Sequence, residues 1–325
     1  MTDRPIPLSV EAAGVTLAGS LWLPEALPPR AAVLMWPGSG PSDRDNDVFF
    51  PPIRRHLLAS AIAVASFDKR GVGGSSGDWR DADIVDQAAD AQAIVDQLFD
   101  LEALAGGPLG LFGHSQGGWV VLEAAAADDR LAFVVASSGP GVSPGRQERY
   151  AIARGAERDG LEPDEVQRLL EEHDALGTML RRGASFAQFR QTVELEPDRA
   201  TRYRSLERYT LIPGDEREWA FFGRLFDHDP RPALERISCP ILALFGGADR
   251  VVPVVESVAV YHEAREARGE LKVHVFPGAD HRCGVGAPSE MAPGYFDLLA
   301  AWIAGTTARK GQASVDPTRH GSSTA

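Results

Sequence analysis

The sequence of 325 residues predicts an α/β fold, in which a mostly parallel central sheet carries helices on both faces and one helical insertion. Three observations lead to this prediction. Short, continuously apolar runs alternate with segments of helical spacing, as expected for buried strands joined by helices. Several of these runs end in glycine-rich loops, where α/β sheets place their ligands. Finally, residues 143–235 are rich in Arg and Glu and show helical spacing without a convincing strand.

The chain opens with an antiparallel hairpin followed by a buried strand. Val10–Pro24 alternates around Ala13-Gly14, which is typical of strand, turn and strand. Ala31–Trp36 is continuously apolar and ends in a Pro-Gly-Ser-Gly-Pro loop, so it predicts a buried parallel strand. The remaining core elements are predicted as a helix over Pro51–Ser60, a strand over Ala61–Phe67, a helix over Asp81–Leu104, strands over Leu109–Phe112 and Leu131–Ser137 with a helix over Gly117–Ala127 between them, a strand over Ile237–Phe245, a helix over Val254–Ala264, a strand over Leu271–Phe276 and a closing helix over Met291–Ala304.

Two polar loops in the first half have alternative interpretations. Residues 68–75 contain a glycine cluster, but the G-K-[ST] sequence of a phosphate loop is missing and the glycine spacing breaks at Ser76, which favours a structural turn. Residues 42–47 form either a solvated loop or a segment in which Arg44 makes a buried ion pair that braces the site.

The stretch that carries chemistry is Gly113-His114-Ser115-Gln116-Gly117. It follows an apolar run and precedes a helix-forming segment, which is the setting that a G-x-S-x-G nucleophile elbow requires. The serine of such a turn has a strained backbone, and flanking glycines avoid collisions that a Cβ would make. The free N–H groups and positive end of the following helix favour an oxyanion. Although the pattern also occurs by chance, this context predicts that Ser115 attacks a carbonyl.

An elbow serine needs a base, and the base needs an acid that fixes its tautomer, in the chain order serine, acid, histidine. Of the eight histidines, His281 is placed in a loop just past a predicted strand end. His114 neighbours Ser115, but its side chain is expected to point away at the turn. Asp249 follows a buried strand and lies between Ser115 and His281 in the chain. Asp280 is the rival acid, although a residue rarely reaches the imidazole next to it.

These motifs together resemble the α/β-hydrolase superfamily, in particular serine esterases with a helical cap. The resemblance covers nearly the whole chain outside the insertion and the tail. It rests on the hairpin start and on five motifs, which are the Pro37-Gly-Ser-Gly loop, the Asp68-Lys-Arg-Gly-x-Gly turn, the Gly113-His-Ser-Gln-Gly elbow, Gly-Gly-Ala-Asp249 and Gly-Ala-Asp-His281.

The resemblance implies that Ser115 is the nucleophile, Asp249 the acid and His281 the base. It also implies an oxyanion hole made by the backbone N–H groups of Gln116 and Ser39. The oxyanion loop departs from the family's His-Gly and H-G-G-G versions because it begins with Pro37-Gly. The resemblance implies a hydrolase core over residues 1–142 and 236–305 and a cap over 143–235. Residues 306–325 lack apolar periodicity and are predicted to be disordered.

The expected reaction is cleavage of a carboxylic ester or related acyl compound through an acyl-serine intermediate, which a water activated by His281 then releases. No cofactor or metal is expected. Thioester, lactone and amide substrates remain open, as does acyl transfer to an alcohol or peroxide. A non-catalytic ligand-binding protein is the least favoured alternative because all three triad residues are present. Serine in place of a carboxylate nucleophile argues against haloalkane and epoxide substrates.

Composition narrows the partners to a small acyl substrate. The formal net charge of −13 argues against nucleic acid and anionic membranes as partners. No signal sequence and no uninterrupted apolar run of membrane-spanning length are visible, so a cytoplasmic protein is expected. Cys239 and Cys283 lack metal-ligand spacing and are expected to be free thiols. The oligomeric state stays open.

Overall fold

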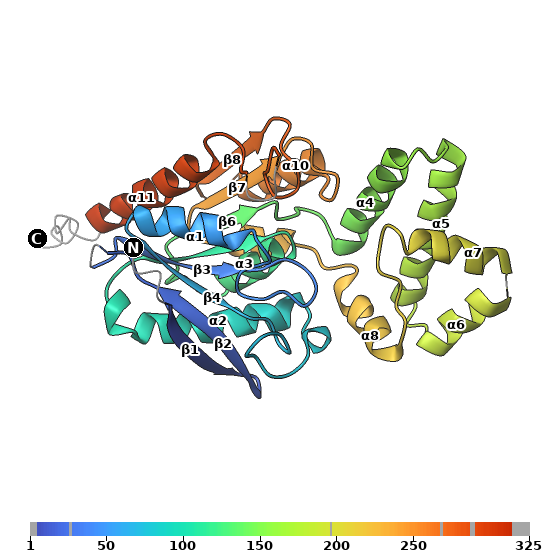
Figure 1. Cartoon of the computed structure of the whole chain (residues 1–325), viewed down its shortest axis with the longest axis horizontal. Helices are drawn as coiled ribbons and strands as arrows, with labels where there is room; N and C mark the ends of the chain where they lie inside the picture. The colour runs from blue at the N-terminus through green and yellow to red at the C-terminus, as the bar shows by residue number, and fades with distance from the viewer. Residues whose placement is uncertain (1–4, 26–27, 196, 267–268, 287–289, 314–325) are drawn as a thin grey trace, which may run out of the picture.

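The computed structural model describes residues 5–25, 28–195, 197–266, 269–286 and 290–313. Within these residues eight strands form one sheet in the order β1-β2-β4-β3-β5-β6-β7-β8 (Figure 1). β2 pairs antiparallel with both β1 and β4, and every other neighbouring pair is parallel. The strands are β1 (Ile6–Ala12), β2 (Val15–Trp22), β3 (Ala31–Trp36), β4 (Ile62–Phe67), β5 (Leu109–His114), β6 (Val134–Ser137), β7 (Ile241–Gly246) and β8 (Leu271–Phe276).

Helices cover both faces of the sheet, which confirms the predicted fold class (Figure 1). Successive side chains of β3 alternate between two apolar layers. Leu34 and Trp36 belong to the layer formed with α2, α3 and α10, whereas Val33 and Met35 belong to the layer formed with α1 and α11. Every residue of β3 through β7 is buried, as a strand covered on both faces requires. These helices are α1 (Phe50–Ala59), α2 (Ile84–Asp100), α3 (Gln116–Ala126), α10 (Val254–Arg265) and α11 (Tyr295–Ala313).

A helical insertion follows β6 and lies beyond one end of the sheet (Figure 1). It has an apolar cluster of its own, to which Ile152, Leu170 and Trp219 contribute. The last helix of the insertion, α8, also places Phe221 and Phe222 in the sheet's apolar layer, so this helix joins the two bodies. The insertion consists of α4 (Pro144–Arg158), α5 (Pro163–Arg181), α6 (Phe186–Leu195), α7 (Pro197–Leu206) and α8 (Glu216–Leu225). The next helix, α9 (Arg231–Arg236), packs on α3 and α10.

One predicted helix is interrupted in the structure. The helix expected over Asp81–Leu104 is divided into α2 and flanking 3₁₀ turns at Trp79–Asp81 and Glu102–Leu104. The cause at its start is Asp83, whose carboxylate accepts the N–H groups of Val85 and Asp86 while Asp86 accepts the N–H of Asp83. This reciprocal cap makes α2 begin at Ile84.

The prediction of disorder from residue 306 onward is wrong for residues 306–313. Helix α11 continues through Ala313, and Thr306 and Thr307 are buried. The Thr307 hydroxyl donates to the carbonyl of Ile303, which satisfies this polar group inside the helix. Tertiary packing therefore extends a helix that apolar periodicity does not predict. Residues 314–325 lie outside the described residues.

The ion pair at residues 42–47 is made with a distant partner. Arg44 pairs with Asp68, whose carboxylate oxygens accept from Arg44 Nε at 3.0 Å and Nη2 at 2.5 Å. Burial raises the pKa of Asp68, but hydrogen bonds from Arg44 and from the Gly74 N–H outweigh it, so the net pKa is lowered. The pair ties the loop after β3 to the turn after β4. No described helix has the length and apolarity to span a membrane.

Candidate active site

Ser115 lies in the turn between β5 and α3 with φ 53° and ψ −121°, a conformation that a non-glycine residue rarely adopts. The neighbouring glycines allow the turn because other backbone segments contact them. A Cβ at Gly113 would collide with the carbonyl of Gly117, and a Cβ at Gly117 would lie 2.5 Å from the carbonyl oxygen of Trp36. The elbow therefore packs directly on the end of β3, and the glycine spacing follows from this contact.

The structure brings Ser115, His281 and Asp249 into one hydrogen-bonded chain. His281 follows β8, and its Nε2 lies 3.0 Å from Ser115 Oγ. Its Nδ1 lies 2.9 Å from Oδ2 of Asp249, which follows β7. With an ionised Asp249, Nδ1 carries the proton, so the Nε2 lone pair faces the Ser115 hydroxyl. This arrangement can remove a proton from Ser115.

The Asp249 carboxylate is fully buried and held by its own loop. Its Oδ1 accepts the N–H groups of Val251 at 2.7 Å and Val252 at 2.9 Å. The rival acid, Asp280, accepts the N–H groups of Arg282 and Gly284 within its own loop.

His114 lies closer to the site than predicted. Its ring does not point away from the site but packs beside His281, with ring centroids 5.2 Å apart, and its Nδ1 lies 3.3 Å from the carbonyl oxygen of Ser137. Burial first, and then the neighbouring His281 and Arg282, hold the pKa of His114 well below its ordinary value. His114 therefore stays neutral at neutral pH and adds no positive charge beside His281.

The two predicted oxyanion donors belong to the two segments that meet at Ser115, the start of α3 and the loop after β3. Gln116 is the first residue of α3, so its N–H belongs to the first turn and has no partner within the helix. Ser39 lies in the loop after β3, and both residues line the same pocket as Ser115. The preceding Gly38 is so near that a Cβ there would lie 3.7 Å from Ser115 Cβ.

Lys69 is a buried residue of this region that the sequence analysis assigned only to a turn. Its Nζ donates to the carbonyl of Gly38 at 2.5 Å and to Oε1 of Gln116 at 2.8 Å. Burial lowers the pKa of Lys69 to about 7. The signal in the sequence was a lysine two residues past the carboxyl end of a buried strand, where α/β sheets place functional side chains.

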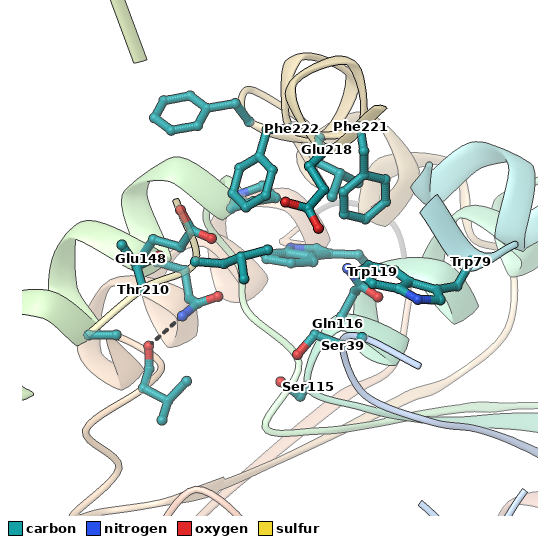
Figure 2. Close-up of a pocket in the computed structure, with 18 of the residues that line it drawn as sticks. Ser39, Trp79, Ser115, Gln116, Trp119, Glu148, Thr210, Glu218, Phe221 and Phe222 are labelled. Atoms are coloured by element: carbon teal, nitrogen blue, oxygen red, sulfur yellow. Dashed lines mark hydrogen bonds between the residues drawn. The ribbon is translucent and has the colours of Figure 1, made fainter. Parts of the chain in front are cut away.

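Two pockets meet at Ser115 and His281. The first, called here the cap-side pocket, has a volume of about 600 Å³ and lies between the sheet and the insertion. Figure 2 shows Ser115 and Ser39 on one side, with Phe221 and Phe222 across the pocket on α8. The lining is largely apolar and includes Trp79, Trp119, Pro144, Ala151, Tyr209, Leu211, Phe221, Phe222, Leu225 and Phe226.

The second pocket, called here the polar pocket, has a volume of about 470 Å³ and also reaches Ser115 and His281. Its other lining residues are mostly polar or charged and include Ser42, Asp43, Asn46, Asp47 and Arg282. Ser115 and His281 can therefore be reached both from an apolar pocket and from a polar one.

The described residues hold no group of three or more His, Cys, Asp or Glu side chains placed to bind a metal. Cys239 and Cys283 are both buried free thiols. Burial raises the pKa of Cys283 to about 12, so this thiol is not a thiolate nucleophile at neutral pH.

The strand order, the elbow between β5 and α3 and the helical insertion after β6 define an α/β-hydrolase fold. The chain belongs to the alpha/beta hydrolase family, whose sequence profile matches residues 33–293. No curated protein matches the chain.

Solved structures share this fold at low sequence identity. The Pyrococcus furiosus esterase Pf2001 aligns with a TM-score of 0.61 at 17% identity, covering 95% of this chain and 92% of the esterase. Est1E from Butyrivibrio proteoclasticus with bound ferulic acid aligns with 0.58 at 17%, covering 94% and 99%. The proline iminopeptidase of Mycobacterium smegmatis aligns with 0.58 at 20%, covering 95% and 100%.

Proposed function

We propose that this protein is a serine hydrolase that cleaves a carboxylic ester or a related acyl compound. The observation that carries the proposal is the hydrogen-bonded chain in which one nitrogen of His281 lies 3.0 Å from Ser115 Oγ and the other lies 2.9 Å from the Asp249 carboxylate. This is the geometry that a serine, its base and an orienting acid require. Two of the structural neighbours are named esterases, and one of them binds ferulic acid.

The reaction follows from this geometry. His281 Nε2 takes the Ser115 proton as Oγ attacks the substrate carbonyl, and the backbone N–H groups of Gln116 and Ser39 bind the oxygen that becomes negative. The tetrahedral intermediate collapses when His281 returns the proton to the departing alkoxide, which leaves an acyl group on Ser115. His281 then removes a proton from water as the water attacks the acyl-serine. Collapse of the second intermediate releases the carboxylic acid and restores the Ser115 hydroxyl.

The two pockets assign places to the reactants. The cap-side pocket takes the apolar part of the substrate, because aromatic and aliphatic side chains dominate its wall. The polar pocket, which also reaches His281, supplies the attacking water because most of its lining side chains are polar or charged. Since α4, α8 and the segment 209–211 form much of the cap-side wall, residues 143–235 act as a cap that selects the substrate.

The experiment is a panel of p-nitrophenyl esters of increasing acyl length, lactones and acyl thioesters, followed by product release. We expect p-nitrophenyl esters to be cleaved by the wild type, with a rate that falls about 10⁴-fold or more in Ser115→Ala. The Ser115→Ala variant should keep its fold, because the change removes one oxygen atom, and circular dichroism checks this. Activity of Ser115→Ala near that of the wild type would overturn the proposal.

A further inference from the structure

Lys69 is a buried cation whose partners are neutral. Its residue exposure is 4%, and no described carboxylate forms an ion pair with it. The carboxylate of the adjacent Asp68 accepts hydrogen bonds from Arg44 instead. An ammonium group buried without a counter-ion costs stability. A chain that needed only packing at this position would be more stable with an apolar side chain, so what the lysine contributes lies in the hydrogen bonds that it donates.

Both acceptors of Lys69 belong to the two segments that flank Ser115. One is the carbonyl oxygen of Gly38, which shares a planar peptide group with the N–H of Ser39. In a trans peptide the C=O and the N–H point in opposite directions, so holding the Gly38 oxygen also aims the Ser39 N–H. The other is Oε1 of Gln116, which lies at the start of α3 directly after Ser115.

The loop after β3 needs such a restraint. Residues 37–41 contain two glycines, and Gly40 has φ +74°, so several backbone conformations are accessible to the free loop. Asn46 holds the loop on one side, since its Oδ1 accepts the Gly38 N–H at 3.2 Å. Lys69 holds the next peptide group, the one that contains the Ser39 N–H. The two contacts together fix both peptide groups of Gly38.

We propose that Lys69 is the positioning residue of the oxyanion hole: it holds the Gly38 carbonyl and the Gln116 side chain so that the Ser39 N–H points at the reacting carbonyl oxygen. This inference rests on the proposed serine-hydrolase function. Lys69 lines neither pocket, so it acts through these two residues and not on the substrate itself.

The test is Lys69→Met, which puts an unbranched apolar side chain, one atom shorter than lysine, in its place and removes its donors. Because a misaimed donor is lost only in the transition state, kcat should fall about 10- to 100-fold while KM changes less than about threefold. An alkyl trifluoromethyl ketone provides a second measurement, since addition of Ser115 Oγ places an oxyanion in the hole. Its affinity should fall by the same factor as kcat/KM. The corresponding secondary alcohol, which fills the pocket without addition, should bind within about twofold of the wild type.

Arg265→Met is the matched control. Arg265 is also a buried cation that donates to carbonyl oxygens, those of Leu234, Ile237 and Cys239, but it contacts no residue of the site. Its folded variant should keep the wild-type kcat even if its melting temperature falls. If Lys69→Met does not fold, Lys69→Gln replaces it, because its amide is polar but one bond too short to keep both contacts.

Three results would overturn the inference: a kcat within about threefold of the wild type in a folded Lys69 variant, an equal loss of affinity for the ketone and the alcohol, or an equal fall of kcat in Arg265→Met. Failure of the wild type to cleave any ester, lactone or acyl thioester of the panel would instead contradict the proposed function, so the two failures are distinguishable.

Discussion

The Asp249 carboxylate accepts a hydrogen bond from His281 Nδ1 at 2.9 Å with one oxygen and two backbone N–H groups with the other. The two oxygens of the Asp249 carboxylate therefore have different roles. Oδ1 shapes the loop after β7 and Oδ2 orients the imidazole.

Asp249→Asn should separate these roles. The amide oxygen can still accept the loop N–H groups, so the fold and melting temperature should change little. The NH₂ group cannot accept from Nδ1, so it favours the wrong imidazole tautomer, and kcat should fall about 10⁴-fold. The matched control is Asp280→Asn, which changes the neighbouring carboxylate that does not contact His281 and should keep kcat within about threefold. A larger loss in Asp280→Asn than in Asp249→Asn would assign the acid to Asp280.

A pair of substitutions at Ser39 tests whether the backbone or the side chain is the oxyanion donor. Ser39→Ala keeps the N–H and should change kcat little, whereas Ser39→Pro deletes it. Loss of one donor costs about 10²- to 10³-fold in kcat, or about 3 to 4 kcal/mol. Melting temperature must be measured with the rate, because proline can also strain the loop. A folded Ser39→Pro enzyme with normal kcat would move the donor to another residue, and a large loss in Ser39→Ala would implicate the hydroxyl.

The charge of the cap-side pocket predicts its substrate preference. Glu148 and Glu218 line the described pocket, which has no Lys or Arg in its wall (Figure 2). A neutral ester should therefore have a higher kcat/KM than an ester of equal size that carries a carboxylate into this pocket, by about 10-fold at low salt. Glu148→Gln should reduce the difference, and Glu216→Gln, at an exposed position of α8 outside the pocket, should not. A faster reaction of the anionic ester would contradict this reading of the pocket.

Lys69 should also make the stability depend on pH. The folded protein lowers its pKa from 10.5 to about 7. Between these values the unfolded chain binds more protons, so the free energy of unfolding rises with pH, and this gain is lost as pH falls through about 7. Compared with Lys69→Met, the wild type should gain roughly 2 kcal/mol of stability between pH 7 and pH 9. Urea unfolding at both pH values measures it, and a difference between the two proteins that does not change with pH would mean that Lys69 titrates normally.

Features that depend on residues close together in the chain could be predicted from the sequence. A buried strand that ends in Gly113-x-Ser115-x-Gly117 defines its own turn, because the glycines are required wherever that turn packs. The continuous apolar runs predicted the parallel strands, because a strand that is buried on both faces has no alternating polar residues. The positions of Asp249 and His281 just past strand ends also followed from local pattern, and with them the prediction that they meet Ser115.

Contacts between segments that are far apart in the chain depended on the tertiary fold. Lys69 reaches acceptors 31 and 47 residues away, and Arg44 pairs with a carboxylate 24 residues away. The sequence around Lys69 does not indicate which acceptors its amine reaches, and a lysine in a loop is normally solvated. The part of α11 that follows residue 306 could not be predicted either, because it depends on packing against the rest of the protein. The physical reason is that burial, which sets the partners and pKa of these groups, exists only once the sheet has brought its strand ends together.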